Sequence, residues 1–293
     1  MPIACREGYL PLHEGLIWYR IAGPPRGIPL LVVHGGPGIP HDYLDPLEQL
    51  ADERPVVFYD QLGCGRSGRP DNPALWTVER YVRELKALRE LLGLYRFHLF
   101  GHSWGSILAA EYAFTRPEGL VSLVFAGPAF SIPRVIQDAE RLKAGLPEPV
   151  RVTLDTHIRQ GSTDSLEFRQ AVYEYQYRHV CRIRPFPRPF QQASGGMGLQ
   201  VLETMLGLSI FTVEGNLKTY DCVSRLRELS LPVLLTCGHH DQSTPEAAAE
   251  YQKLIPGSRL AVFENSSHMP HLEETDAYLR VIRDFLREMD KNG

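Results

Sequence analysis

The sequence has no long apolar run and little excess charge. Nowhere does it approach the ~20 consecutive apolar residues that a membrane-spanning helix requires. Its formal net charge is only -4, because 31 basic residues are mixed among 35 acidic ones. Such a mixture indicates no basic surface for nucleic acid or anionic lipid. We therefore expect neither a nucleic acid nor a membrane as a partner.

Cysteine is also scarce, and its spacing is not that of a metal or disulfide protein. The five cysteines are an odd number, and no two of them form a Cys-Xaa-Xaa-Cys pair. This pattern favours reduced thiols and argues against a zinc site. The first residues lack the basic segment followed by an apolar one that is typical of a secretory signal. We expect a cytoplasmic protein without a bound metal.

What the sequence does contain is an alternation of strand-type apolar runs with helix-type amphipathic runs. At 293 residues, 43% of them hydrophobic, the chain suits one α/β domain with an inserted subdomain better than two separate domains. The alternation predicts a mostly parallel sheet flanked by helices. Strand-type runs cover residues 30–33, 55–59, 95–100, 120–125, 232–237 and 259–263, after two short strands within 8–21; helix-type runs include 78–92, 106–116 and 276–289.

The alternation is lost in the middle of the chain. Residues 130–222 contain long polar helical stretches and a proline-rich piece. An insertion of this kind between two core strands is typical of a helical cap, which shapes the substrate pocket and excludes water. We predict an α/β core of residues 1–129 and 223–293 and a helical cap of residues 130–222.

The stretch Gly101-His102-Ser103-Trp104-Gly105 lies between a strand-type run and a helix-type run. A serine hydroxyl is a poor nucleophile unless its oxygen stands clear of the backbone and a base can reach it. The two glycines stand where larger side chains would collide with the sharp strand-to-helix turn that exposes such a serine. We predict Ser103 as a nucleophile, because its position between a strand and a helix argues against a chance match.

A glycine-rich loop, His34-Gly35-Gly36-Pro37-Gly38, follows the strand-type run at residues 30–33. Such a loop can present backbone N–H groups to an anion. In serine hydrolases of this layout, one oxyanion donor comes from this loop and the other from the residue after the nucleophile. We predict Gly36 and Trp104 as the donors; a tight turn after the strand is the structural alternative.

An acid and a base for this serine follow later in the chain. Asp241 stands just after the run at residues 232–237, and open α/β sheets place their chemistry at the carboxyl ends of strands. His268 follows the run at residues 259–263. The order serine, acid, histidine is that of α/β-hydrolases. We predict a catalytic triad of Ser103, Asp241 and His268.

The acid and the base each have a rival. Asp60 is the alternative acid, although it precedes the serine and suits a structural turn better. His271 is the alternative base, but Met269-Pro270 turns the chain toward the last helix and leaves His268 nearer to the end of the strand. We interpret all other histidines as packing or loop residues.

Residues 60–68 contain a Gly-Xaa-Gly-Xaa-Xaa-Gly pattern, but it does not indicate a dinucleotide site. A dinucleotide fingerprint opens a helix directly, so that the pyrophosphate lies on the helix N-terminus. Here Arg69-Pro70-Asp71-Asn72-Pro73 interrupts the chain at once. We therefore predict no cofactor.

Four stretches together resemble the proline iminopeptidase family of α/β-hydrolases. They are residues 34–38, 60–67, 101–106 and 267–274, and the likeness extends over nearly the whole chain. The resemblance implies an α/β-hydrolase fold with an inserted, mostly helical cap. It also implies a serine peptidase or amidase that cleaves a small amide- or peptide-type bond through an acyl-enzyme, with the triad and oxyanion donors named above.

The resemblance further implies that two glutamates hold the free amino terminus of the substrate, and here the sequence departs from the family. The corresponding positions are Ile210 and Gln242. A desolvated ammonium without a carboxylate is costly. Glu214 could replace the missing carboxylates if the local backbone turns it inward. The predicted substrate-binding residues are therefore Gly35, Ile210, Glu214 and Gln242.

Three classes of function follow. We favour a proline iminopeptidase-like hydrolase that acts on a small molecule or a short peptide. The alternative is an esterase, acyl amidase or lactonase that acts on a small hydrophobic substrate without a free amine. A non-catalytic binding module is the third class, and the filled triad and oxyanion positions argue against it. The sequence indicates no oligomeric state.

Overall fold

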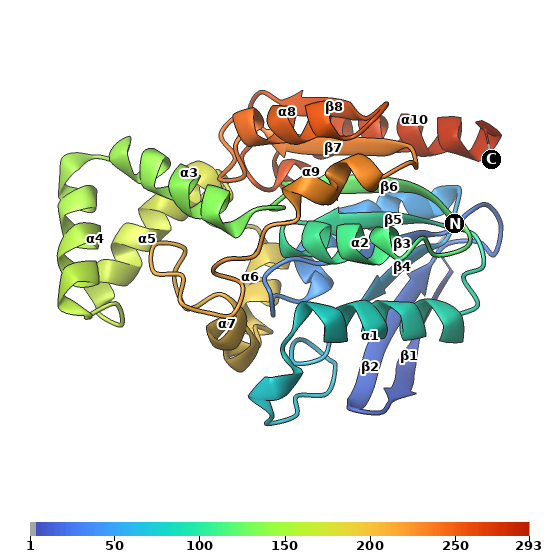
Figure 1. The fold of residues 1–293 in the computed structure, drawn as a ribbon, viewed down its shortest axis with the longest axis horizontal. Coiled ribbons are helices and arrows are strands. Elements are labelled where there is room, and N and C mark those ends of the chain that lie inside the picture. The colour runs from blue at the N-terminus through green and yellow to red at the C-terminus, as the bar shows by residue number, and fades with distance from the viewer. Residues whose placement is uncertain (1–3, 293) are drawn as a thin grey trace.

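The computed structural model describes residues 4–292. An eight-stranded sheet crosses the molecule in the order β1-β2-β4-β3-β5-β6-β7-β8 (Figure 1). β2 runs antiparallel to both of its neighbours, and the strands from β3 to β8 run parallel to one another, which confirms the predicted sheet. The strands are β1 (Cys5–Leu12), β2 (Gly15–Ala22), β3 (Leu30–Val33), β4 (Val56–Tyr59), β5 (Phe97–His102), β6 (Leu120–Ala126), β7 (Val233–Gly238) and β8 (Arg259–Phe263).

The central strands are buried on both faces. Successive side chains of a strand point to opposite sides of the sheet. In β3, Leu31 and Val33 therefore pack in one core, and Leu30 and Val32 pack in the other. All four side chains are fully buried, as expected for parallel strands covered by helices on both sides.

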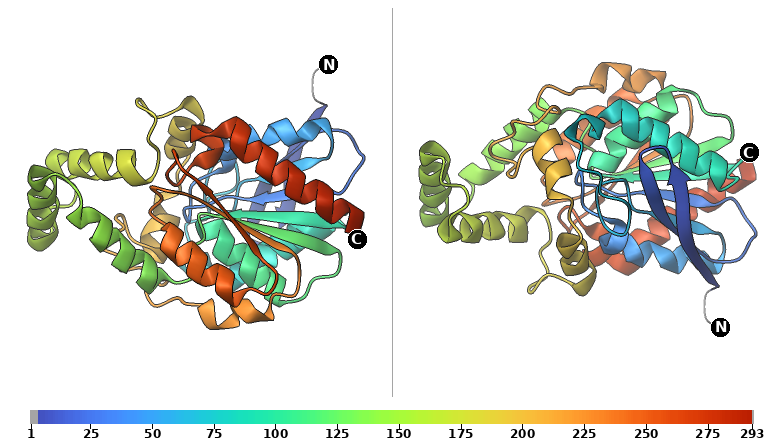
Figure 2. Two further views of the ribbon diagram at one scale, coloured as in Figure 1. Left: turned by 90° about the horizontal axis from the view of Figure 1, so that it is seen from above. Right: turned by 90° about the horizontal axis from the view of Figure 1, so that it is seen from below.

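Helices form a layer on each face of the sheet (Figure 2). One core contains side chains of α1, α2 and α8, and the other contains side chains of η1 and α10. No helix within residues 4–292 combines the length and the apolar character needed to cross a membrane. These layers comprise α1 (Val78–Leu91), α2 (Trp104–Phe114), α8 (Pro245–Leu254), α9 (Pro270–Glu273) and α10 (Thr275–Asn292), with the 3-10 helices η1 (His41–Asp52), η2 (Pro73–Leu75) and η3 (Val223–Glu228).

Most predicted elements lie where the sequence pattern put them. The helix predicted at residues 78–92 is α1, and its predicted cap is present, because the Thr77 hydroxyl accepts a hydrogen bond from the Arg80 amide at 3.3 Å. The helix predicted at residues 106–116 begins earlier, at Trp104, because the chain turns from β5 into α2 at a single residue. The sequence analysis missed η1, whose 3-10 turns carry a proline, Pro46, in their middle.

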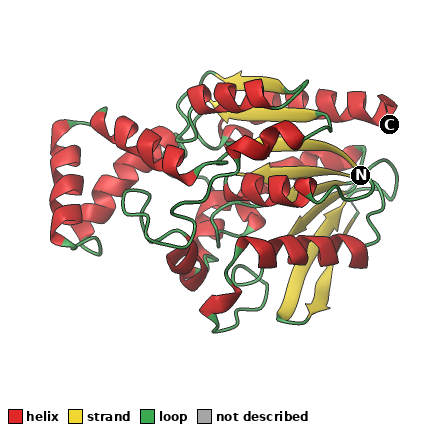
Figure 3. Ribbon diagram, in the orientation of Figure 1, coloured by secondary structure: helices red, strands yellow, loops and turns green. Residues whose placement is uncertain are grey.

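Helices alone make up the regular structure of the insertion between β6 and β7, and they lie beyond the carboxyl edge of the sheet (Figures 1 and 3). Its two ends lie side by side, because Ser131 and Asp221 form an isolated antiparallel bridge. The exact division at residues 130 and 222 stays a prediction. The helices are α3 (Ile132–Ala144), α4 (Glu148–Gln160), α5 (Leu166–His179), α6 (Arg188–Gly195) and α7 (Leu199–Met205).

Parallel strands bring their carboxyl ends to one edge of the sheet, and the predicted site residues follow several of those ends. The glycine-rich loop follows β3, Ser103 follows β5, Asp241 follows β7 and His268 follows β8. The insertion follows β6 and therefore starts from the same edge. Residues that are far apart in the chain are thus collected in one place.

The close packing of α2 onto the sheet gives a first prediction. A β-carbon at Gly105 would lie 2.4 Å from the carbonyl oxygen of Val33 and 2.7 Å from that of His34. The Gly105→Ala variant should therefore lower the free energy of unfolding by about 1–3 kcal/mol, because backbone atoms must move to admit the methyl group. Urea denaturation of the two proteins measures this change.

Gly195 provides the matched control. It closes α6, and a β-carbon there would have no heavy atom within 4 Å. The Gly195→Ala variant should leave the free energy of unfolding unchanged or raise it by up to about 1 kcal/mol, because alanine favours the helix. Equal stability of the Gly105→Ala variant and the wild type would contradict the close packing described here.

Candidate active site

Ser103 occupies a sharp turn between β5 and α2. Its backbone has φ 55° and ψ -121°, a conformation that residues other than glycine rarely adopt. The Ser103 amide donates a hydrogen bond to the carbonyl oxygen of Ala126 at 2.8 Å, which ties the turn to β6. A β-carbon at Gly101 would lie 2.2 Å from the Gly105 carbonyl oxygen. Small residues on both sides of the serine are therefore a steric requirement of this turn.

Asp241 and His268 meet at the carboxyl ends of β7 and β8. The Nδ1 atom of His268 lies 2.7 Å from Oδ1 of Asp241, and both side chains are buried. The same carboxylate oxygen accepts the amide of Ser243 at 2.7 Å, which holds the carboxylate in place. Since Nδ1 is engaged with Asp241, only Nε2 of the imidazole is free to exchange a proton with another group.

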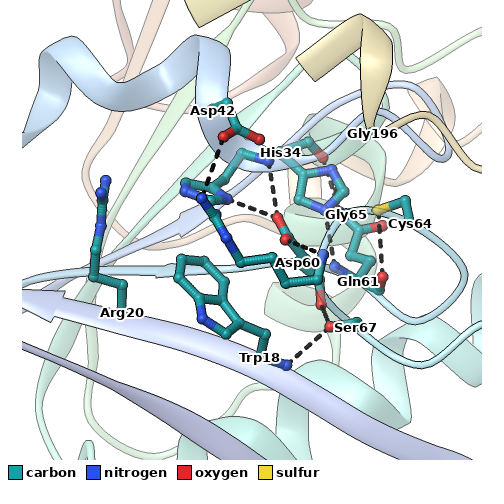
Figure 4. A network of polar contacts seen from close by, with 12 residues as sticks. Trp18, Arg20, His34, Asp42, Asp60, Gln61, Cys64, Gly65, Ser67 and Gly196 are labelled. Atoms are coloured by element: carbon teal, nitrogen blue, oxygen red, sulfur yellow. Dashed lines mark hydrogen bonds and ion pairs between the residues drawn. The ribbon is translucent and has the colours of Figure 1, made fainter. Parts of the chain in front are cut away.

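Asp60, the rival acid, has a structural environment. It accepts hydrogen bonds from the ring and the backbone amide of His41 and from the amide of Arg66 (Figure 4). Burial by itself would raise the pKa of Asp60, but the hydrogen bond and charge of His41 outweigh burial and hold that pKa below its usual value. Asp60 thus orders the loop after β4 and does not contact His268.

His271, the rival base, is also placed elsewhere. Its ring packs against the rings of Tyr43 and His102 and is completely buried. Burial, aided by the nearby charge of His268, lowers the pKa of His271 to about 3. The histidine in contact with Asp241 is His268, and His271 has no such contact.

Some backbone N–H groups near Ser103 already donate a hydrogen bond within the protein, and others do not. Gly36 lies on the wall of the same cavity as Ser103. Trp104 is the first residue of α2, so its amide has no acceptor within the helix. The amide of Gly35, by contrast, donates to the hydroxyl of Tyr43 at 2.7 Å. The backbone donor of Gly35 is therefore already used, and its role as a substrate-binding residue stays a prediction.

A cavity of about 480 Å³ opens next to Ser103 and His268. The core supplies one side of it, and α5, α6 and residues 208–210 of the insertion supply the other. Two of the predicted substrate-binding residues, Ile210 and Gln242, lie on its wall. Glu214 does not: its side chain is exposed and it is not among the lining residues, so the condition that it turns inward is not met in this structure.

Known proteins resemble this chain over nearly its full length. The family model described as the alpha/beta hydrolase fold matches residues 28–275. A proline iminopeptidase of Heyndrickxia coagulans is 44% identical over 285 residues, which cover 97% of this chain and 99% of that protein. The crystal structure of a proline iminopeptidase from Mycobacterium smegmatis has a TM-score of 0.92 at 35% identity, covering 98% of this chain and 99% of that one. The crystal structure of VinJ has a TM-score of 0.94 at 36% identity, covering 98% of this chain and 100% of that one.

The chain belongs to the proline iminopeptidase family of α/β-hydrolases. Because these relatives share 35–44% of their residues with it over nearly its full length, the chain is a peptidase-like serine hydrolase. They confirm the α/β-hydrolase fold that the four sequence stretches implied, and they do not favour the alternative activities.

In this member of the proline iminopeptidase family, Gln61 joins the two segments that carry the predicted oxyanion donors. Its side-chain oxygen accepts the indole N–H of Trp104 at 2.9 Å, and its side-chain nitrogen donates to the carbonyl oxygen of His34 at 2.9 Å. The backbone amide of Gln61 donates to Nε2 of His34 at 2.9 Å (Figure 4). Burial lowers the pKa of His34 to about 4, so this ring stays neutral and can accept that bond.

A second chain of hydrogen bonds links the glycine-rich loop to His268. The hydroxyl of Tyr43 accepts from the Gly35 amide and lies 2.8 Å from Nδ1 of His102, to which it donates. The Nε2–H of His102 then donates to the backbone carbonyl of His268 at 2.9 Å. Every group in this chain is buried, so the loop, the nucleophile turn and the histidine loop are held together without water.

The sequence analysis missed these supporting residues. Gln61 lies within the stretch at residues 60–67, which signalled the family but no role for the side chain. Tyr43 and His102 are 59 positions apart, and no local pattern indicates that they touch. Residues 61–68 form turns and begin no helix, in agreement with the absence of a dinucleotide fingerprint. No group of three or more His, Cys, Asp or Glu side chains in residues 4–292 is arranged to hold a metal ion.

The bridge made by Gln61 can be tested with Gln61→Met. This change leaves the His34 carbonyl and the Trp104 indole buried without partners, which should lower the free energy of unfolding by about 1–3 kcal/mol. We also expect kcat to fall about 10–100-fold with little change in KM, because the two donor segments lose their alignment for the transition state. Steady-state kinetics and urea denaturation measure the two effects.

Gln200→Met is the matched control. Gln200 also accepts a tryptophan N–H, that of Trp76 at 3.0 Å, but it lies off the cavity wall. Loss of this bond should affect stability alone. An equal fall in kcat for the two variants would show that Gln61 has no particular role at the site.

Proposed function

We propose that the protein hydrolyses a small amide- or peptide-type acyl bond through an acyl-enzyme on Ser103, in the manner of proline iminopeptidases. One observation carries the proposal: Ser103 and His268 share the wall of one cavity, and His268 is held by Asp241 at 2.7 Å. The relatives from Heyndrickxia coagulans and Mycobacterium smegmatis support the choice of an amide or peptide bond, since both bear the name proline iminopeptidase.

In the proposed reaction, Nε2 of His268 takes the proton of the Ser103 hydroxyl as the serine oxygen attacks the carbonyl carbon of the substrate. Asp241 fixes the tautomer of His268 and stabilises the imidazolium that forms. The amides of Gly36 and Trp104 receive the developing oxyanion. Loss of one such donor costs on the order of 3 kcal/mol in the activation barrier.

The tetrahedral intermediate then collapses, and His268 gives its proton to the leaving amine. A water molecule, deprotonated by His268, attacks the acyl-enzyme and releases the acid. The helices of the insertion line the cavity opposite Ser103 and limit the entry of bulk water, which strengthens the hydrogen bonds to the oxyanion.

We further propose a small molecule or a short peptide as the substrate, neither nucleic acid nor a membrane as a partner, and the cytoplasm as the place of action. A cavity of about 480 Å³ has the size of a small-molecule site. The five cysteines are all free thiols, as is usual in a reducing compartment.

The role of Ser103 is tested with Ser103→Ala. Turnover of an alanyl or prolyl anilide should fall at least about 10³-fold, because no acyl-enzyme can form. A serine-directed phosphonate should label the wild type and not the variant. Circular dichroism and Tm should stay unchanged.

Ser224→Ala is the control, since Ser224 is exposed and lies away from the cavity. It should retain both labelling and turnover. Wild-type turnover by the Ser103→Ala variant would rule out the proposed nucleophile.

A further inference from the structure

The wall of the cavity carries no carboxylate, ammonium or guanidinium. Its titratable side chains are the histidines His102 and His268 and the tyrosines Tyr43, Tyr173 and Tyr175. His102 is kept neutral, because burial and the neighbouring histidines lower its pKa. Within the part of the chain that the structure describes, the surface offered to a substrate beside Ser103 therefore carries no anionic side chain.

The acidic side chains of the neighbouring segments have other partners. Glu174 of α5 binds Arg178 at 2.9 Å and Arg184 at 3.0 Å. Glu273 of α9 accepts hydrogen bonds from the hydroxyl and amide of Ser267. Asp241 contacts His268 through Oδ1; its Oδ2 has no hydrogen-bond partner within residues 4–292, and Asp241 is not among the residues that line the cavity. None of these three carboxylates lies on the cavity wall.

An ammonium group loses its hydration when it enters such a cavity. Without an opposite charge this loss is expensive, and hydrogen bonds to neutral oxygens recover only part of it. The cavity wall therefore disfavours an acyl group that carries a free amine and favours one that is neutral.

The wall also carries a polar group that lacks a protein partner. Tyr175 is 1% exposed, and its hydroxyl has no hydrogen-bond partner within residues 4–292. Burial raises the pKa of Tyr175, so the hydroxyl remains a donor. Gln242 lies on the same wall; its backbone amide donates to the carbonyl of His179 at 3.0 Å, and its side chain is half-buried. Buried polar groups normally have partners, so the Tyr175 hydroxyl points to a ligand that supplies one.

We propose that this cavity selects an uncharged acyl group whose own carbonyl or hydroxyl oxygen binds the Tyr175 hydroxyl and the Gln242 amide. An aminoacyl group with an acylated nitrogen fits this description. The proposal rests on the proposed hydrolysis at Ser103, in which the acyl carbon–nitrogen bond breaks and water supplies the hydroxyl of the acid and the proton of the amine. The aliphatic and aromatic groups of Val172, Phe186 and Ile210 on the same wall suit the apolar part of such a group.

The first experiment compares L-alanyl and L-prolyl anilides with their N-acetyl forms at neutral pH. The specificity constant kcat/KM should be at least tenfold higher for the acetylated member of each pair. Equal constants, or a preference for the free amines, would overturn the proposal.

A second experiment adds the missing charge. Gln242→Glu places a carboxylate on the cavity wall, so it should shift the ratio of the two specificity constants at least tenfold toward the free amine. Gln160→Glu adds the same charge at the exposed end of α4 and should leave the ratio unchanged. The proposal fails if both variants shift the ratio equally or if neither does.

The Tyr175 contact is tested with Tyr175→Phe. The specificity constant for the N-acetyl anilides should fall at least tenfold, while Tm stays the same or rises because an unpaired buried hydroxyl is removed. A role in packing alone predicts the opposite pattern, a lower Tm with an equal loss for all substrates, and that result would count against the proposal.

Glu214→Gln tests whether the exposed carboxylate reaches the substrate. We expect no change in the ratio of the specificity constants, and a selective loss of free-amine turnover would overturn the proposal.

Phosphonate labelling distinguishes a failure of the proposed hydrolysis at Ser103 from a failure of the proposed acyl-group preference. If Ser103 is not labelled and no substrate turns over, the hydrolysis itself is wrong; if labelling persists and free amines are preferred, only the choice of acyl group is wrong.

Discussion

The close approach of α2 to β3 and β5 is the constraint on which the site depends. Glycines at 101 and 105 let the helix backbone lie against the strand backbones, and a β-carbon at either position would collide with a carbonyl oxygen. Only this approach permits the turn that raises Ser103 at the carboxyl edge of the sheet. The unusual φ of Ser103 is stabilised by the rigid elements on both sides and by its amide bond to β6.

A set of buried hydrogen bonds between neutral groups connects the loops of the site. Gln61 connects the glycine-rich loop to the start of α2, and the Tyr43–His102 pair connects the same loop to the loop of His268. These bonds lie in a low-dielectric interior, where a satisfied network is rigid and an unsatisfied group is costly. Groups from four separate loops are thereby held in register without a metal ion or a disulfide in the described part of the chain.

The insertion supplies most of the side chains that line the cavity. Its helices bring aromatic and aliphatic side chains, together with the Tyr175 hydroxyl, to the cavity opposite Ser103. The core thus supplies the groups for bond cleavage, and the insertion supplies most of the wall that meets the acyl group. A family likeness that is strong in the core stretches therefore says less about the acyl group than the wall itself does, because most of the wall is built from segments outside those stretches.

The sequence alone determined the sheet, the helical insertion, the family and the candidate residues Ser103, Asp241 and His268, because strand and helix periods and short local patterns carry that information. It left two acids and two bases as rivals, and it could not place the side chain of Glu214 or the partner of the Gly35 amide. Only the tertiary structure decided that His268 meets Asp241, that Tyr43 occupies the Gly35 amide and that Glu214 points outward. These are contacts between segments distant in the chain, and no local pattern of residues encodes which side chains meet once the sheet has closed.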